Sequence, residues 1–211
     1  MNRAELVKTI AEEILAHHTS IPFPVTVSNR HVHLDEASRE LLFGGKPLTV
    51  KKFLAQPGEF AAEETVKVIG PKGHFESVRV VGPERSACQL EISLGDCYQL
   101  GVEPVLRDSG NLEGTPGIYL AGPFGMIKME RGVIVAQRHI HMIPSEAKKH
   151  GINNLQKVRI RFGTGSRRGI LGDVIVRVSE KYAPECHVDV EEANALGIKN
   201  NDTVFLEIGG I

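Results

Sequence analysis

Residues 138–154 read RHIHMIPSEAKKHGINN, and residues 185–201 read ECHVDVEEANALGIKNN. In both stretches a histidine is followed, at identical spacing, by Glu-Ala, then Gly-Ile, then Asn. Each stretch predicts a strand, a short helix that ends at a glycine, and a turn into the next strand. Two such units packed around a pseudo-two-fold axis would close one small barrel. Equivalent points would then face each other, bringing His187 towards His139 and His141.

Most of the remaining chain consists of short β-like segments bounded by glycine and proline, such as PVTVSNRHVHL at 24–34 and GDVIVRVSE at 172–180. Many short strands favour a mainly β fold of barrels or sandwiches. Between them lie short helical stretches that end at glycine. The glycine-rich run at 107–125 is expected to be a linker or a long functional loop between two halves.

The N-terminal stretch MNRAELVKTIAEEILAHHTS predicts an amphipathic helix, with Asn2 and Glu5 spaced as a capping box. Charged residues interrupt its apolar positions, so it fits neither a signal peptide nor a membrane span. We expect it to dock on its own domain; the alternative is a targeting helix for a larger assembly.

The composition is that of a soluble globular protein, with 211 residues, 41% hydrophobic residues and a formal net charge of −1. A net charge this close to zero does not indicate the basic surface that binds nucleic acid or an anionic membrane, although it is compatible with a small anionic ligand. Three cysteines without a CxxC motif do not form a disulfide framework. They favour a cytoplasmic location.

The chain contains Arg-His-x-His twice, with histidines at 31 and 33 and again at 139 and 141. Alternating side chains place both imidazoles of each pair on one face of a strand, where both can bind one metal ion. Catalytic zinc usually takes three protein ligands and keeps an open position. The repeat nominates His187 as the third ligand of the second pair. For the first pair a carboxylate is expected, and Glu91 is the candidate.

Other interpretations of these residues stay open. A single His-x-His is more often a pair of surface or hydrogen-bonded histidines, but two copies within a repeat favour metal ligands. Arg30 and Arg138 alternate away from their histidines and are expected to form structural ion pairs. Arg85, six residues before Glu91, has the guanidinium suited to phosphate, although a surface ion pair explains it equally well. A mononuclear cupin-like enzyme and a metal-stapled structural protein are the competing functions.

Seven ordered stretches make the chain similar to a known family: VSNRHVHL, PGEFAAEETVKVIGPKG, VRVVGPERSACQLEIS, LRDSG, LAGPFG, GVIVAQRHIHM and HVDVEEANA. Over about residues 24–206 they resemble the PduL-type phosphotransacylases, or phosphate propanoyltransferases. The resemblance implies two small β-barrels capped by short helices. We expect an N-terminal helix at 1–22, a first barrel at 23–120 and a second at 121–211, with strands exchanged between barrels as a further option.

The resemblance also implies an activity. Acyl-CoA and phosphate would be converted reversibly to acyl phosphate and coenzyme A at a dinuclear zinc site, with propanoyl-CoA or acetyl-CoA as substrate. Phosphate would attack the thioester directly. One Zn²⁺ would be held by His31, His33 and Glu91, and the other by His139, His141 and His187. Arg85 would hold phosphate, and the residues implied to contact coenzyme A are Ser28, Lys52, Arg79 and Asn194.

Several properties stay open at this point. Plain thioester hydrolysis would release coenzyme A without using phosphate. The sequence leaves open the preferred acyl chain, the physiological direction and whether the chain forms a homo-oligomer. It also leaves open whether the protein works free in the cytosol or inside a bacterial microcompartment with other components of that compartment.

Overall fold

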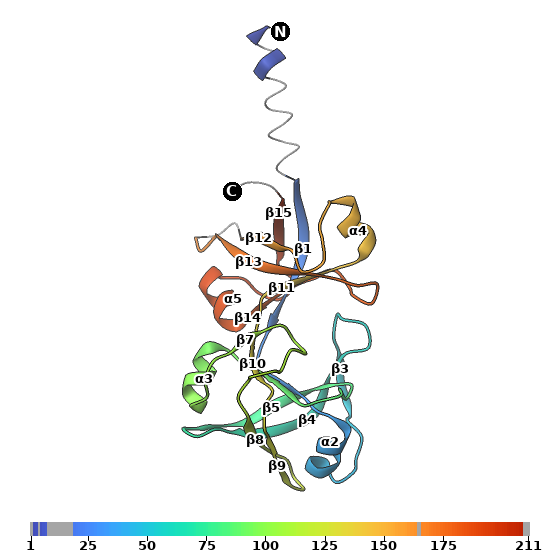
Figure 1. Ribbon diagram of the computed structural model, residues 1–211, viewed down its shortest axis with the longest axis vertical. Helices are drawn as coiled ribbons and strands as arrows, with labels where there is room; N and C mark the ends of the chain where they lie inside the picture. The colour runs from blue at the N-terminus through green and yellow to red at the C-terminus, as the bar shows by residue number, and fades with distance from the viewer. Residues whose placement is uncertain (1, 4, 8–18, 164–165, 209–211) are drawn as a thin grey trace. The chain divides into compact units, whose positions relative to one another are not determined.

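The computed structural model describes residues 2–3, 5–7, 19–163 and 166–208, and Figure 1 shows its elements. The chain forms two compact units. The central unit comprises residues 28–137, and the terminal unit comprises residues 1–27 and 138–211. The expected mainly β fold with two barrel-like sheets and short helices is confirmed: one sheet is a closed barrel and the other is a curled half-barrel.

The terminal unit is a closed barrel with the strand order β1-β14-β11-β13-β12-β15. Its strands are β1 (Thr19–Ser28), β11 (His139–Met142), β12 (Lys157–Phe162), β13 (Gly169–Val178), β14 (Glu185–Asp189) and β15 (Thr203–Ile208). Helices α4 (Pro144–Lys149) and α5 (Val190–Leu196) follow β11 and β14. Because β1 pairs with β15, the two ends of the chain close the same barrel.

The central unit is built on a nine-stranded sheet. Its elements are β2 (His31–His33), α2 (Glu36–Phe43), β3 (Val50–Phe53), β4 (Phe60–Ile69), β5 (His74–Gly82), β6 (Gln89–Glu91), α3 (Leu94–Leu100), β7 (Leu106–Arg107), β8 (Ile118–Ala121), β9 (Met126–Met129) and β10 (Val133–Ala136). The strand order is β7-β10-β6-β2-β5-β4-β8-β9, with β3 paired to β4. The short strand β2 therefore lies at the centre of this sheet, between β6 and β5.

The predicted repeat takes the form of an antiparallel strand pair in the barrel. Strand β11 pairs with β14 so that His139 lies opposite His187 and Ile140 lies opposite Cys186. Ile140 and Cys186 are fully buried in the barrel core, so the histidines point to the other face. The expected approach of His187 to the second histidine pair is confirmed.

The central unit contains an equivalent strand pair. Strand β2 pairs antiparallel with β6, placing His31 opposite Glu91, Val32 opposite Leu90 and His33 opposite Gln89. Val32 and Leu90 are fully buried at the middle of this pair, as Ile140 and Cys186 are in the barrel. Each unit therefore presents four alternating side chains on one face of a two-stranded ribbon.

The expected domain limits differ from the units of the structure. The limit between residues 120 and 121 falls inside β8, because β8 to β10 complete the sheet of the central unit. The run at 107–125 is no linker between the units, since it stays within the central unit. The helix expected over 1–22 overlaps β1, which begins at Thr19 to pair with β15.

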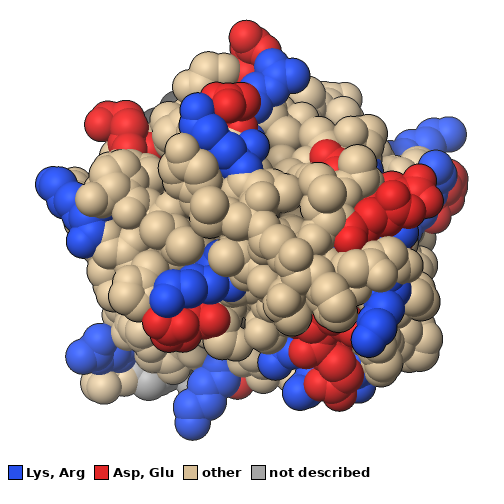
Figure 2. Space-filling view, turned by 90° about the horizontal axis from the view of Figure 1, so that it is seen from below, with Lys and Arg blue, Asp and Glu red and all other residues tan. Residues whose placement is uncertain are grey.

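Most of the expected N-terminal helix lies outside the described residues. Within them, Asn2 and Glu5 make both reciprocal bonds of the predicted capping box, at 2.8 and 2.9 Å. Among the described residues, no helix is long and apolar enough to cross a membrane. On the face shown in Figure 2, basic and acidic side chains are interspersed around an uncharged centre, without a massed positive patch.

Candidate metal centres

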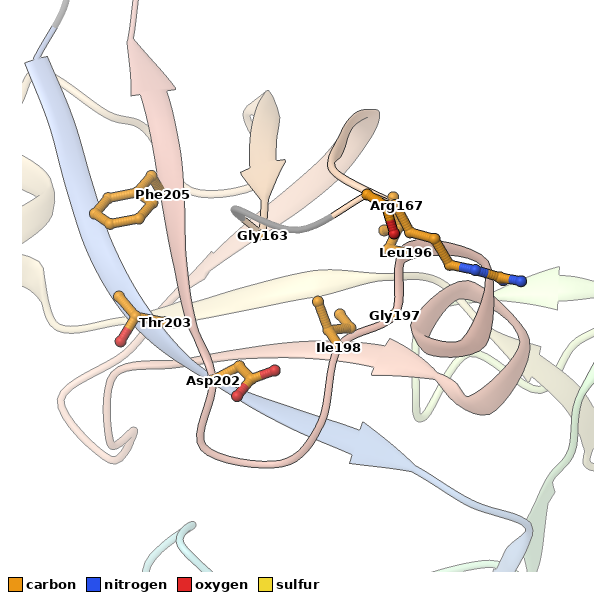
Figure 3. Close-up of a pocket in the computed structure, with 9 residues that line it drawn as sticks. Gly163, Arg167, Leu196, Gly197, Ile198, Asp202, Thr203 and Phe205 are labelled. Carbon is orange, nitrogen blue, oxygen red and sulfur yellow. The ribbon is translucent and has the colours of Figure 1, made fainter.

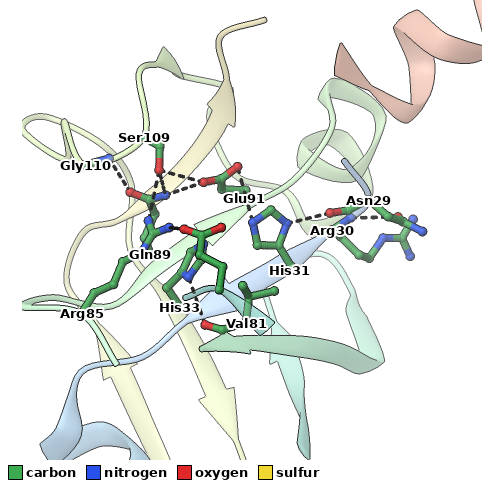
Figure 4. Close-up of polar contacts among 11 residues, drawn as sticks. Asn29, Arg30, His31, His33, Val81, Arg85, Gln89, Glu91, Ser109 and Gly110 are labelled. Carbon is green, nitrogen blue, oxygen red and sulfur yellow. Dashed lines mark hydrogen bonds and ion pairs between the residues drawn. The ribbon is translucent and has the colours of Figure 1, made fainter. Parts of the chain in front are cut away.

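The first candidate centre consists of His31, His33 and Glu91, on the β2–β6 ribbon of the central unit. Backbone carbonyls hold one nitrogen of each imidazole: His31 Nδ1 lies 2.8 Å from Asn29 O, and His33 Nδ1 lies 3.0 Å from Val81 O (Figure 4). Such contacts fix a ring and leave Nε2 as the ligand atom. Nε2 of His31 lies 3.6 Å from Oε2 of Glu91.

The electrostatics of this group suit a cation. Burial opposes ionisation of Glu91, but the charges of His31, His33 and Arg85 outweigh it and lower its pKa to about 2. Burial, with help from His31 and Arg85, lowers the pKa of His33 to about 3. At neutral pH Glu91 is therefore ionised and His33 is neutral, which are the protonation states that metal binding requires.

A hydrogen-bond network connects Arg85 to this centre (Figure 4). Arg85 Nη1 donates to Ser109 Oγ over 3.1 Å, and Ser109 Oγ donates to Glu91 Oε1 over 3.0 Å. Gln89 Nε2 donates to Glu91 Oε1 over 2.6 Å and also to Ser109. The same carboxylate oxygen accepts both bonds, so Oε2 of Glu91 is left on the side of His31.

The second candidate centre consists of His139, His141 and His187, on the β11–β14 ribbon of the terminal unit. The ring centroids of His139 and His187 are 4.7 Å apart in a stacked arrangement. The other two ring pairs are separated by 4.8 and 4.7 Å. All three ligand atoms lie within 4.8 Å of one another, a spacing that one metal ion can bridge.

Orphaned nitrogens show that a metal ion fits the second centre. Both ring nitrogens of His141 and Nε2 of His187 are buried and have no hydrogen-bond partner among the described residues. A buried polar atom without a partner is costly, and a bound cation would satisfy it. Burial, followed by the charges of His187, His139 and Arg177, lowers the pKa of His141 to about 2, so this imidazole is neutral at neutral pH, as metal binding requires.

Comparisons with known proteins assign the chain to a family. Residues 24–199 match the family model described as phosphate propanoyltransferase. The chain belongs to the phosphate propanoyltransferase family. A relative of that name from Thermotoga maritima is 51% identical over 183 residues, covering 86% of this chain and 87% of the relative. A relative of the same name from Rhodopseudomonas palustris is 52% identical, and the match covers 87% of this chain and 82% of the relative. Another from Salmonella typhimurium is 45% identical, and the match covers 93% of each chain. Membership supports a phosphate acyltransferase activity.

This member of the phosphate propanoyltransferase family has four residues that we expect to contact coenzyme A. They are divided between the two units. In the central unit, Ser28 is half-buried where β1 ends, and Lys52 is exposed on β3. Arg79 lies opposite His31 on β5, where its Nη1 donates to the carbonyls of Ala62 and Glu63. In the terminal unit, Asn194 is exposed on α5.

A cavity of about 400 Å³ lies beside α5 in the terminal unit and contains none of the six ligand candidates (Figure 3). Leu196, Gly197 and Arg167 line it, and Arg167 Nη1 donates to the carbonyl of Asn194 over 2.9 Å. The cavity therefore adjoins the helix that carries Asn194, and none of the ligand candidates lines it.

Sequence reasoning missed part of the shell around both centres. Thr26 and Tyr182 carried no motif; Thr26 donates to Glu185, and Tyr182 stacks on His141 at 3.9 Å. Ser109 lies in the LRDSG stretch, but no pattern in the sequence connects it with Arg85 or Glu91, which it contacts in the structure. The position of Gln89 could be predicted, because a residue two positions before Glu91 lies on the same face of the strand as Glu91.

The leading arginines of both motifs form ion pairs, as expected. Arg30 contacts Asp96 over 2.8 Å, and Arg138 contacts Glu192 over 2.7 Å. Asp96 and Glu192 each occupy the third position of a helix and complete a capping box there. Each arginine therefore ties a histidine strand to the helix that follows the opposite strand.

We expect Glu192→Ala to lower the free energy of unfolding by about 2 kcal/mol, since it removes an ion pair and part of a helix cap together. Urea unfolding followed by circular dichroism measures this change. Lys157→Ala is the control, because it breaks an exposed pair with Asp173 and should change stability by about 0.5 kcal/mol or less. Equal stability of both variants would contradict the structural role of Arg138 and Glu192.

Proposed function

We propose that the protein transfers a short acyl group, propanoyl or acetyl, between coenzyme A and inorganic phosphate, using two zinc ions, one held by each unit. His31, His33 and Glu91 would hold one ion, and His139, His141 and His187 the other. The observation that carries this proposal is the occurrence of two matching ligand groups in a member of the phosphate propanoyltransferase family. Imidazole and carboxylate ligands in sets of three suit zinc.

The chain's own residues supply the anion site. Arg85 presents a planar fork of donors that matches phosphate oxygens, and its side chain is partly exposed. Its present partners are Ser109 and Glu59, the latter at 3.3 Å. Because Ser109 also bonds to Glu91, a phosphate held by Arg85 would lie next to the first centre. Positioning of this kind is a large part of catalysis between two substrates.

In the proposed reaction a phosphate oxygen attacks the thioester carbonyl carbon directly. A carbon–oxygen bond forms, the carbon–sulfur bond breaks, and the proton of hydrogen phosphate ends on the coenzyme A thiol. Bound zinc would supply Lewis-acid polarisation of the carbonyl and stabilise the leaving thiolate. A protein nucleophile is not needed: burial raises the pKa of both Cys88 and Cys186, which disfavours their thiolates.

Contacts to coenzyme A belong to the same proposal. Ser28, Lys52, Arg79 and Asn194 would bind this substrate. Lys52 and Arg79 are cationic and suit the phosphates of coenzyme A, whereas Ser28 and Asn194 offer hydrogen bonds.

A product assay tests the proposed function. Purified protein with propanoyl-CoA and phosphate should release coenzyme A and form one acyl phosphate for each thiol, detected as a hydroxamate. Without phosphate, the release of coenzyme A should fall to background. Release at the same rate without phosphate would mean thioester hydrolysis, and no release from propanoyl-CoA or acetyl-CoA would favour a structural role for the metals.

A further inference from the structure

Arg85, the proposed phosphate ligand, already contacts a carboxylate of the same chain. Its Nη1 donates to Ser109 Oγ over 3.1 Å, and its Nη2 donates to Glu59 Oε1 over 3.3 Å. The side chains of Arg85 and Glu59 are 32% and 35% exposed, so both can be reached from solvent. Ser109 links Arg85 to the first centre, whereas Glu59 has no role in the proposed reaction.

The two terminal nitrogens of this guanidinium are held in different ways. Nη1 is anchored, because Ser109 is itself fixed by its hydrogen bonds with Glu91 and Gln89 (Figure 4). Nη2 has Glu59 as its one hydrogen-bond partner among the described residues. A phosphate that leaves the Ser109 contact in place therefore needs Nη2, which is the donor that Glu59 occupies.

The side chain of Glu59 can leave Arg85 without a change in the backbone. Glu59 lies in the turn between β3 and β4, where its N–H donates to Gln56 O over 3.1 Å and its carbonyl accepts from Leu54 N over 3.0 Å. The side chain of Gln56 is buried, which holds the turn against the unit. Neither backbone bond involves the carboxylate, so rotation of one partly exposed side chain is enough to free Nη2.

Phosphate is a stronger partner for Arg85 than Glu59 is. A single contact between partly exposed charges contributes little, whereas phosphate can accept two parallel hydrogen bonds from a guanidinium. Glu91 is the other acid whose charge interacts with Arg85, and a metal ion bound at the first centre would offset that charge. Glu59 has no cationic partner besides Arg85 in the part of the chain that the structure describes. It is therefore the carboxylate that competes with phosphate for this guanidinium.

We propose that Glu59 is a built-in competitor of phosphate and sets the affinity of the protein for this substrate. The anion site is closed while Glu59 pairs with Nη2 of Arg85, and it is open when Glu59 turns to solvent. The apparent dissociation constant of phosphate is then the intrinsic constant divided by the open fraction. The inference rests on the role of Arg85 in the proposed function and deepens it.

Steady-state kinetics of Glu59→Gln tests this role, because the substitution removes the charge and keeps the size of the side chain. It should lower KM for phosphate by about two- to fivefold, the change that corresponds to a partly exposed ion pair. The kcat should not change, since Glu59 is displaced in both the bound state and the transition state. In the reverse reaction, KM for acyl phosphate should fall by a similar factor. Glu76→Gln, which removes an exposed carboxylate paired with Lys67 in the same unit, should change none of these values.

A double-mutant cycle with Arg85→Ala separates competition for the guanidinium from repulsion of phosphate through space. If Glu59 acts by pairing with Arg85, Glu59→Gln should give no improvement over Glu76→Gln once Arg85 is absent. An improvement of the same size in the Arg85→Ala background would mean that Glu59 only repels the anion, and it would overturn the proposal.

Calorimetric titration of the zinc-loaded full chain with inorganic phosphate, without acyl-CoA, gives a readout besides activity. Glu59→Gln should bind phosphate about two- to fivefold more tightly than the unmodified protein does. Equal affinity, or binding detected in neither protein, would overturn the proposal. Weaker binding would also overturn it, because Glu59 would then orient Arg85 for phosphate.

The acyl phosphate assay on the unmodified protein separates this inference from the proposed function. If acyl phosphate forms but Glu59→Gln leaves the phosphate affinity unchanged, only the role of Glu59 fails. If Glu59→Gln tightens phosphate binding but no acyl phosphate forms, the competition at Arg85 stands and the proposed function fails.

Discussion

Removing bound metal with a chelator is expected to lower the rate of acyl phosphate formation by about 10³-fold or more, with recovery on adding Zn²⁺. A Lewis acid contributes several kcal/mol to such a reaction, and each 1.36 kcal/mol changes the rate tenfold. His33→Ala should cause a similar loss, because His33 is buried and held by Val81 with Nε2 left to bind the ion. Elemental analysis should give two zinc ions per chain, and one in His33→Ala.

A matched control is available in the same unit. His74 is exposed and contacts only Glu76 among the ion pairs of the described residues, so His74→Ala should retain both the zinc content and the rate. Full activity of metal-free protein would contradict the proposed chemistry. A single iron or manganese ion per chain would instead favour the cupin-like alternative.

Much of the terminal barrel could be predicted from the sequence because one repeat specifies it. The spacing shared by residues 138–154 and 185–201 places β11 beside β14, and period-two alternation then requires His139, His141 and His187 to share a face. The limits of the units could not be predicted in this way. They depend on non-local pairing, such as that of β1 with β15, which leaves no local pattern in the sequence.

The same limit applies to the sites. A His-x-His pair is a local pattern that the sequence shows directly. Glu91 could also be predicted as a ligand candidate, because it lies on a short predicted strand. The bond from Thr26 to Glu185 joins residues 159 positions apart. The link from Arg85 through Ser109 to Glu91 depends on where a glycine-rich loop folds back. Only the coordinates reveal these contacts.

Arg85→Ala is expected to lower kcat/KM for phosphate by about 10²–10³-fold, the usual effect of removing one preorganised group that stabilises developing charge. The KM for propanoyl-CoA should change by less than about threefold, because Arg85 is proposed to contact phosphate and not coenzyme A. Arg85→Lys keeps the charge but loses the two-pronged geometry, so it should give an intermediate value. Steady-state kinetics with each substrate varied in turn measures these effects.

Because Arg85 belongs to a hydrogen-bond network that includes Glu91, the zinc content of Arg85→Ala must be measured together with its kinetics. Arg85 bonds to Ser109 and Ser109 to Glu91, so a loss of activity could arise by displacing a ligand. Two zinc ions per chain in Arg85→Ala would assign the loss to phosphate binding, and a loss of one ion would assign it to the support of Glu91. Arg131→Ala, which removes an exposed arginine paired with Glu113, should change neither quantity. Normal kcat/KM for phosphate in Arg85→Ala would show that another group holds the anion.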